Sequence, residues 1–326
     1  MLNASKGPDF SFIVPAYNEE AVISKCLASL RQTITPGTPA EIIVVDNGST
    51  DNTRANAERL ESITVYRCPG AKVGAVRNLG ARKARGQYLV FIDADCLVDP
   101  DFLARAKDLV KTDPERVWGG GATNPENATW VERHWLLETD GKALLPKHLI
   151  GASILAPRFL FEKVGGFDEN LESGEDTNLH HRFLMAGITV SMTDALNVAH
   201  LGNAKTISAF FHRQAWHGRS YHPNPLKNLH DPVYILTLLS GLGALVGLLL
   251  LPAMPREGAL LLAFSAMAPA ILTAKRFLRA KRWPRSLREA IRCYVLDGMY
   301  VMGRLKGAID SSLNPQSRTT QNSEPR

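Results

Sequence analysis

Short apolar runs alternate with predicted helices through the first hundred residues. The runs occupy residues 10–14, 41–45, 63–66 and 89–92, and each is followed by polar residues and a helical segment. Continuous apolar runs of this length are typical of strands buried on both faces of a parallel sheet. Four β–α units in succession predict an α/β fold with a Rossmann-like, doubly wound and mostly parallel sheet.

Polar residues follow the carboxyl ends of the predicted strands, which meet at one edge of the sheet. Tyr17 and Glu19 follow the first strand, Asp46 ends the second, and Arg77 lies in the loop-to-helix segment before the fourth. Ligands of open α/β sheets bind beyond the carboxyl ends of the strands. Each residue alone could be an ordinary turn or cap residue. Their recurrence in successive units favours a ligand site.

The fourth strand ends in two carboxylates, Asp93 and Asp95, within the sequence QYLVFIDADC. Hard oxygen donors suit Mg²⁺ or Mn²⁺, which proteins often hold through one or two carboxylates and the phosphates of a substrate. Aspartates are also common after strands as turn residues. The pair therefore predicts a metal site because it coincides with the other polar residues at this edge.

Composition limits the class of protein. The chain has 326 residues, a formal charge of +6 and a pI near 9.2. Its four cysteines show no paired spacing and are expected to be free thiols in a reducing compartment. No signal peptide is expected at the N-terminus, which lacks an apolar core. No fold signature of a nucleic-acid-binding protein is present, so the basic balance favours an anionic membrane as partner over nucleic acid.

The C-terminal third carries two long apolar segments. Residues 233–251 contain no charge and are long enough to cross a bilayer, and residues 258–274 form a second, shorter segment. A basic run, residues 275–282, follows and is expected on the cytoplasmic side. The sequence predicts a transmembrane hairpin in the inner or plasma membrane, with the N-terminal α/β domain in the cytoplasm. Two buried helices of a globular domain are the alternative.

Three regions are expected from these patterns. Residues 1–222 form the α/β domain, in two halves at about 8–100 and 101–222. Residues 223–310 form the membrane hairpin and an amphipathic helix, whose apolar positions recur at helical spacing. Residues 311–326 form a disordered tail. The basic aromatic segment FFHRQAWHGRSYH is expected to be an interfacial helix rather than a metal site.

Six motifs together resemble the family 2 glycosyltransferases, a large inverting group with the GT-A fold. In chain order they are P-A-Y-N-E-E, V-V-D-N-G-S-T-D, G-A-V-R-N-L-G-A, F-I-D-A-D, G-G-F-D-E and G-E-D-T-N-L, spread over about residues 8–200. The resemblance implies a nucleotide-sugar donor, most commonly a UDP-sugar, a divalent metal, and transfer with inversion at the anomeric carbon.

The resemblance makes residues 1–222 the catalytic domain, with a nucleotide-sugar half at about 8–100 and an acceptor half at 101–222. It also implies roles for residues on the donor side. Those around the nucleobase and ribose would be Pro15, Ala16, Tyr17 and Glu19. Asp46 would hold the base, Arg77 would contact base or phosphate, Asp93 would face the ribose and metal, and Asp95 would bind the metal.

On the acceptor side, the resemblance assigns Glu175 and Asp176 to the start of a helix. An inverting transfer needs a carboxylate that takes the proton from the acceptor hydroxyl, and Asp176 is the candidate. Glu175 could share this role or bind the acceptor, and a plain acidic first turn is the structural alternative. His200 is a candidate third metal ligand, because some GT-A enzymes place one there. A structural histidine is equally consistent with the sequence.

The expected function is therefore transfer of a sugar to a lipid, lipid-linked or polysaccharide acceptor in the biosynthesis of cell-envelope polysaccharide or glycolipid. A processive polysaccharide synthase is an alternative, but the Gln-x-x-Arg-Trp motif of that class is not matched by Arg213–Arg219. A catalytically inactive nucleotide-binding membrane protein is a second alternative, although no acidic motif residue is missing. The sequence leaves the sugar, the base and the acceptor open.

Overall fold

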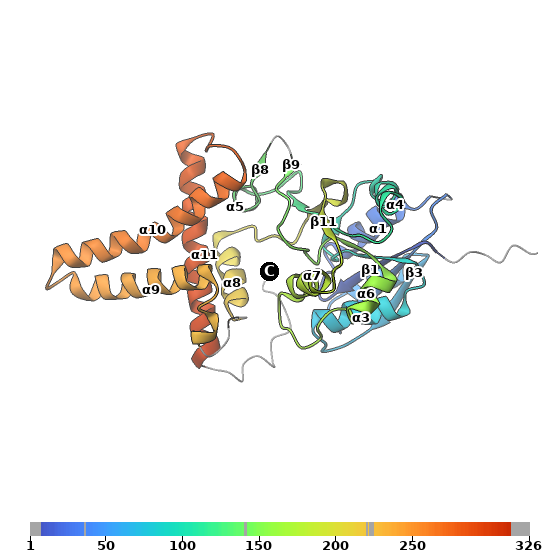
Figure 1. Cartoon of the computed structure of the whole chain (residues 1–326), viewed down its shortest axis with the longest axis horizontal. Helices are drawn as coiled ribbons and strands as arrows, with labels where there is room; N and C mark the ends of the chain where they lie inside the picture. The colour runs from blue at the N-terminus through green and yellow to red at the C-terminus, as the bar shows by residue number, and fades with distance from the viewer. Residues whose placement is uncertain (1–7, 36, 140–141, 220, 222–224, 314–326) are drawn as a thin grey trace, which may run out of the picture. The chain divides into compact units, whose positions relative to one another are not determined.

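The computed structural model describes residues 8–35, 37–139, 142–219, 221 and 225–313. The chain divides into two compact units (Figure 1). Unit 1 comprises residues 1–125 and 142–202, and unit 2 comprises residues 126–141 and 203–326. The segment 203–222, which the sequence analysis assigns to the catalytic domain, thus belongs to the second unit.

Unit 1 is built on a seven-stranded sheet with the strand order β11-β6-β10-β4-β1-β2-β3. Neighbouring strands run parallel except around β10, which is antiparallel to β4 and β6. The predicted, mostly parallel sheet is therefore confirmed. Its strands are β1 (Phe10–Ala16), β2 (Ala40–Asp46), β3 (Ile63–Arg67), β4 (Tyr88–Phe91), β6 (Val117–Gly119), β10 (Ile154–Pro157) and β11 (Val190–Met192).

Helices cover both faces of this sheet, because successive strand residues point to opposite sides. On β1, Phe12 and Val14 belong to one buried cluster, with Leu27 of α1, while Ile13 belongs to the other, with Val76 of α3. The helices of unit 1 are α1 (Ile23–Thr33), α2 (Thr53–Glu58), α3 (Val73–Lys83), α4 (Phe102–Thr112), α6 (Arg158–Lys163) and α7 (Glu175–Met185).

A small sheet of three strands lies beyond the acidic end of β4. It contains β5 (Cys96–Leu97), β7 (Ala122–Thr123) and β12 (Val198–His200), in the order β5-β12-β7. The antiparallel pairing of β12 with β5 sets His200 opposite Cys96. Residues a hundred positions apart in sequence therefore meet beside Asp95. Two short elements complete unit 1, β9 (Lys142–Ala143) and η1 (Asp194–Leu196).

Unit 2 is largely helical. Its elements are α5 (Trp130–Trp135), β8 (Glu138–Thr139), α8 (Ile207–Gly218), η2 (Pro225–Asn228), α9 (Pro232–Leu250), α10 (Pro255–Arg279) and α11 (Leu287–Leu313). Helices α9 and α10 form a long hairpin (Figure 1). Gly247 and Gly258 permit a close approach of the two helices near the turn, and the Ser240 hydroxyl donates to the carbonyl of Ser265 across them.

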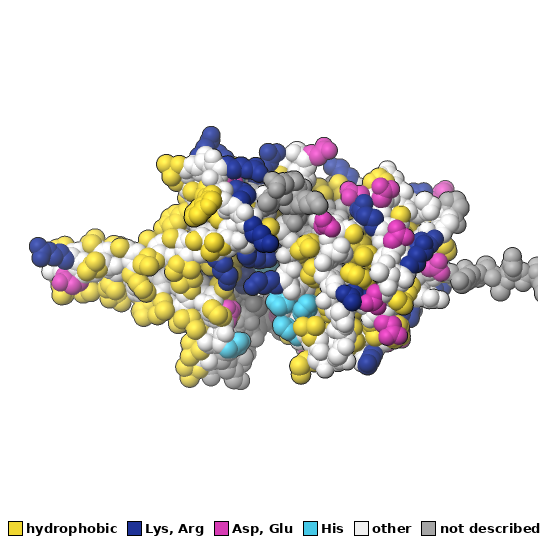
Figure 2. All heavy atoms as spheres, turned by 45° about the horizontal axis from the view of Figure 1, so that its top comes forward, with side chains coloured by type: hydrophobic (Ala, Val, Ile, Leu, Met, Phe, Trp, Pro, Cys, Tyr) yellow, Lys and Arg dark blue, Asp and Glu magenta, His cyan; other side chains and the backbone are white. Residues whose placement is uncertain are grey.

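The hairpin carries the two predicted apolar segments. Both α9 and α10 are long and apolar enough to cross a membrane, by length and composition. Hydrophobic side chains cover much of their exposed surface (Figure 2), among them Leu245, Leu249, Leu260 and Phe264. Helix α10 is longer than the predicted segment 258–274, because it begins at Pro255 and continues through basic residues to Arg279. Pro269 lies inside it without ending it.

Helix α11 packs on α8 through small residues. A Cβ on Gly303 would lie 2.7 Å from Cβ of Gln214, and one on Gly307 would lie 2.1 Å from the carbonyl oxygen of Ala215. The helix continues to Leu313, so the tail predicted from residue 311 is wrong for its first three residues. Ser311 is buried there, and its hydroxyl donates to the carbonyl of Tyr221. Residues 314–326 lie outside the described part of the chain.

Candidate active site

The first strand ends at a network of turns. Asn18, with φ +53°, accepts a hydrogen bond at its side-chain oxygen from the N–H of Thr50. The N–H of Glu19 donates to the hydroxyl of Thr53 at 2.5 Å. These contacts hold the turn after β1, which contains the half-buried Tyr17, against the turn after β2. Both turns therefore form a single fixed surface.

Asp46 closes β2 and is fully buried at 1% exposure. Its carboxylate accepts hydrogen bonds from the N–H groups of Gly48 and Ser49, at 3.2 and 3.1 Å. Gly48 adopts φ +83°, and a Cβ there would lie 2.9 Å from Pro69. Asp46 thus shapes its own loop, in addition to any contact with a ligand.

Arg77 joins the two acidic motifs of the sequence. It lies on α3 with 4% exposure and donates to Asp93 at 2.6 Å and to Glu175 at 2.5 Å. The two carboxylates raise the pKa of Arg77 above its ordinary value, against the effect of burial. The guanidinium also lies over the ring of Phe167, 5.5 Å from its centre. The acidic end of β4 and the start of α7 are therefore held at one place.

Glu175 and Asp176 begin α7 but occupy different environments. Glu175 is buried, and burial holds its pKa above the ordinary value although the ion pair with Arg77 acts in the opposite direction. Asp176 is partly exposed, and its carboxylate accepts from the N–H groups of Gly151 at 3.0 Å and Thr177 at 2.6 Å. Asp176 is consequently the more accessible of the two carboxylates, with a fixed orientation.

Gly151 is required where these groups meet. A Cβ at this position would lie 2.2 Å from Nη2 of Arg77, so any side chain would displace the guanidinium. Its N–H simultaneously orients Asp176. Gly151 thus leaves room for the guanidinium of Arg77 and also orients the carboxylate of Asp176.

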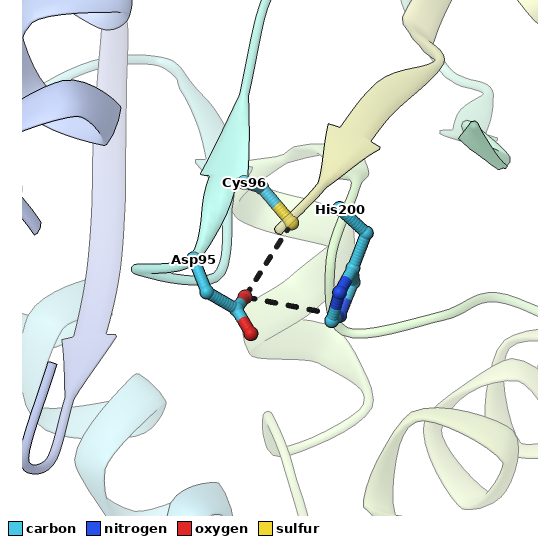
Figure 3. A group of neighbouring side chains, drawn as sticks. All are labelled: Asp95, Cys96 and His200. Atoms are coloured by element: carbon cyan, nitrogen blue, oxygen red, sulfur yellow. Dashed lines mark hydrogen bonds and ion pairs between the residues drawn. The ribbon is translucent and has the colours of Figure 1, made fainter. Parts of the chain in front are cut away.

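Asp95, Cys96 and His200 form a compact group of possible metal ligands (Figure 3). One ligand atom from each lies within 4.8 Å of the others. The distance from Asp95 Oδ1 is 3.7 Å both to His200 Nε2 and to Cys96 Sγ. Burial and the neighbouring aspartates keep the pKa of the Cys96 thiol well above its ordinary value. Gly202 leaves room for Asp95, because a Cβ there would lie 1.8 Å from Oδ2.

This donor set fits a divalent cation. A carboxylate oxygen and an imidazole nitrogen suit Mn²⁺, and the carboxylate also suits Mg²⁺. Carboxylates outnumber the single buried guanidinium in this region, so a cation would reduce the repulsion among them. Asp95 and His200 are therefore suitable to hold the metal that the sequence analysis expects.

The structure brings Asp93, at the end of β4, and Glu175, on α7, together through Arg77. The small sheet brings Asp95 and His200 together. The family resemblance includes Gly151 in the segment before the acceptor-side helix but does not indicate its contacts with Arg77 and Asp176. Sequence reasoning missed Gly202 and the position of Cys96. The motif D-A-D-C placed Cys96 next to Asp95 along the chain, but only the pairing of β5 with β12 shows that its thiol shares the side of His200.

Comparison with known proteins identifies the family. A model described as "Glycosyl transferase family 2" matches residues 11–163. Glycosyltransferase AglE of Haloferax volcanii is 29% identical over 196 residues, which are 56% of this chain and 64% of the relative. Succinoglycan biosynthesis protein ExoA of Rhizobium meliloti is 30% identical over 243 residues, which are 68% of this chain and 71% of the relative.

A solved structure extends the likeness to the fold. The mannosyltransferase PcManGT from Pyrobaculum calidifontis, in complex with GDP-Man and Mn²⁺, matches with a TM-score of 0.57 and 20% identity, over 96% of this chain and 89% of that one. The GT-A-type fold predicted from the motifs is thereby confirmed. The chain spans about two thirds of the length of AglE and somewhat more of ExoA. The similarity to ExoA over 71% of its length and the matching family model show that this chain belongs to glycosyl transferase family 2.

Proposed function

We propose that this protein transfers a sugar from a nucleotide-sugar donor to a hydroxyl group of a lipid, lipid-linked or polysaccharide acceptor at a membrane, with inversion at the anomeric carbon. The observation that carries the proposal is the double ion pair of Arg77, which joins Asp93 of the donor-side motif to Glu175 of the acceptor-side motif. Both halves of a transfer site thus converge on one buried cation. Membership of the family supports the reaction class.

On the donor side, the nucleotide would lie against the turns after β1 and β2. Pro15, Ala16, Tyr17, Glu19 and Asp46 would contact its base and ribose, Asp93 would face the ribose, and a UDP-sugar is the proposed donor. Arg77 would contact the base or a phosphate. Because it forms two ion pairs, its alternative role is to position the carboxylates of Asp93 and Glu175 around the donor. Asp95 and His200 would hold Mg²⁺ or Mn²⁺, which when bound stabilises the negative charge of the departing diphosphate.

On the acceptor side, Asp176 acts as the general base. It takes the proton from the acceptor hydroxyl while the acceptor oxygen bonds to the anomeric carbon and the bond from that carbon to the diphosphate breaks. Two main-chain N–H groups hold its carboxylate in place, which pre-organises the group for proton transfer. Glu175 is engaged by Arg77 and serves as a positioning residue.

The decisive experiment replaces Asp176 by Asn. This change keeps the shape of the side chain and removes its ability to accept a proton, so transfer should fall by about 10²–10⁴-fold, measured with a panel of nucleotide sugars. Donor affinity, measured by calorimetry, should stay unchanged. The exposed Asp108, replaced by Asn, is the matched control and should retain full transfer. Loss of donor affinity with an intact chemical step would reassign Asp176 to the donor site.

The metal is tested separately through Asp95. Asp95→Ala should abolish transfer and weaken Mn²⁺ binding, followed by the paramagnetic resonance signal of the free ion. Asp99→Ala removes a nearby, mostly exposed carboxylate and should leave both unaffected. Full transfer in excess chelator, or normal Mn²⁺ binding by the Asp95 variant, would contradict the assignment.

We also propose that α9 and α10 cross the inner or plasma membrane and that the catalytic unit faces the cytoplasm. The support is the length and apolar surface of both helices and the basic segment after α10. Carbonate washing should fail to release the protein, and a reporter fused after Arg282 should report a cytoplasmic position. Release by salt alone would indicate a peripheral protein, and an external reporter would indicate a single crossing.

A further inference from the structure

An apolar cavity of about 680 Å³ lies between helices α10 and α11, next to the segment that connects them. Phe277, Trp283, Ile291 and Tyr294 supply much of its lining. Phe277 is buried, whereas Trp283 is 87% exposed, so the lining extends from packed protein to the surface. Cavities of about 300–1,000 Å³ are the usual size of sites for small molecules and cofactors.

Two cations belong to the same lining, Lys281 and Arg282. Arg282 is fixed by an ion pair with Glu289 at 2.7 Å and by its position over the Phe277 ring. Its Nε is buried and has no hydrogen-bond partner among the described residues. Lys281 is exposed and has no carboxylate within ion-pair distance in the described part of the chain. The lining of the apolar cavity therefore includes an exposed ammonium group, Lys281, and the guanidinium group of Arg282.

The surrounding segment is strongly cationic. Residues 275–292 contain eight lysines and arginines and one acidic residue, Glu289. Lys and Arg side chains gather at this part of unit 2 in Figure 2. The cavity is also continuous along α10 with its exposed apolar surface, which includes Ile271 and Leu278. A ligand with an anionic head and a long apolar chain would satisfy both properties.

We propose that this cavity is a binding site for an anionic membrane phospholipid, with one acyl chain in the cavity and the phosphate at Lys281, beside the guanidinium of Arg282. The inference rests on the proposed association with a membrane. An inorganic anion would leave the apolar lining unfilled, and a neutral acyl chain would leave the ammonium group of Lys281 uncompensated, whereas Arg282 already pairs with Glu289. Binding of one such lipid would fix the junction of α10 and α11 at the cytoplasmic face.

Native mass spectrometry of the detergent-solubilised full chain, incubated with equal amounts of phosphatidylglycerol and phosphatidylcholine, tests the site. One phosphatidylglycerol should remain bound per chain, with a preference of about fivefold or more from the lysine charge. Ala274→Phe places a large side chain in the lining and should reduce occupancy more than about tenfold, because the acyl chain loses its apolar contacts. Ala263→Phe, an exposed alanine of α10 outside the lining, should have no effect.

A second pair of variants separates the site from general charge. Lys281→Ala should abolish the preference for phosphatidylglycerol, whereas Arg288→Ala removes an exposed cation of the same segment outside the lining and should preserve it. Equal binding of both lipids, or equal losses from the members of either pair, would overturn the proposal. Displacement of phosphatidylglycerol by a polyprenyl phosphate at lower concentration would overturn the choice of occupant.

These outcomes are independent of the proposed membrane span. Release of the protein by salt together with retained phosphatidylglycerol would refute the span and support the site. Resistance to carbonate without a retained lipid would refute the site and leave the span in place.

Discussion

Each unit holds an arginine in an ion pair with a buried or partly buried carboxylate, Arg77 in unit 1 and the partly buried Arg276 in unit 2, and the two arginines differ in their remaining neighbours. In unit 1, Arg77 contacts the side chains of Asp93 and Glu175, and its Nε has no hydrogen-bond partner among the described residues. Its carboxylate partners come from the end of a strand and the first turn of α7. They belong to the group of residues that would meet the substrates.

In unit 2, Arg276 pairs with Asp297 and also donates to the main-chain carbonyls of His134 and Trp135. Its guanidinium lies 4.6 Å from the centre of the Trp135 ring. It therefore connects α10 with α11 and with the end of α5. An arginine–carboxylate ion pair thus supports the proposed site in unit 1 and a junction between helices in unit 2. The two roles differ because the partners of Arg77 come from the proposed site, whereas those of Arg276 come from the neighbouring helices.

The largest effect is expected from Arg77→Met. Removal of the cation leaves Asp93 and Glu175 without their partner, which should lower the free energy of unfolding by about 3–5 kcal/mol and eliminate donor binding. Thermal unfolding and calorimetry measure the two quantities. Arg77→Lys keeps the charge but not the two-pronged geometry, and should recover stability better than donor binding. Normal donor affinity of the Arg77→Met variant would contradict the proposal that Arg77, unlike Arg276, belongs to the donor site.

Arg276→Met should also destabilise the protein, by about 3 kcal/mol, because Asp297 would be buried without its cation. In contrast to the Arg77 variant, the fraction that remains folded should bind the donor with unchanged affinity. Thermal unfolding in detergent and donor calorimetry at low temperature test both points. Reduced donor affinity without a loss of stability would show that the helix junction acts on the site.

Gly151→Ala tests how closely Arg77 is packed. The new Cβ would lie 2.2 Å from Nη2, and the required shift should cost about 1–3 kcal/mol and reduce transfer. Gly298→Ala in α11 is the control, because nothing lies within 4 Å of a Cβ there. That control should be neutral or more stable, since alanine favours helix. Equal behaviour of the two variants in thermal unfolding and transfer assays would contradict the prediction.

Thr273→Val gives the smallest effect. It removes a 2.7 Å hydrogen bond to Asp297 and should cost about 1 kcal/mol, seen as a lower unfolding temperature with normal donor binding. The buried Thr237 hydroxyl has no hydrogen-bond partner among the described residues. Thr237→Val should consequently be neutral or stabilising. A larger loss from Thr237 than from Thr273 would argue against the junction at Arg276.

The sequence predicted those features that depend on short stretches of chain. The buried strands and the polar residues at their ends follow from local patterns, and β1, β2, β3 and β4 were located to within a few residues. The two apolar helices were recognisable for the same reason, although the basic C-terminal part of α10 was not. Apolar periodicity identifies the span but not how far the helix continues beyond it.

Contacts between distant segments could not be predicted. Arg77 and Glu175 are 98 residues apart in sequence, and no local pattern indicates their pairing. Residues 126–141 join the helical unit although they interrupt the chain of unit 1. These residues belong to the helical unit because of a tertiary contact, in which Trp135 packs on Phe210 and Tyr300.

The glycine contacts between α8 and α11 have a consequence for the order in which the chain is built. Gly303 and Gly307 meet a helix that is synthesised before them, with the complete α9–α10 hairpin in between. The ribosome therefore releases α8 with that face uncovered, and the whole hairpin is synthesised before the final helix that covers it. A chain interrupted after α10 would be left with an unfilled surface on α8, which makes it a natural substrate for cellular quality control.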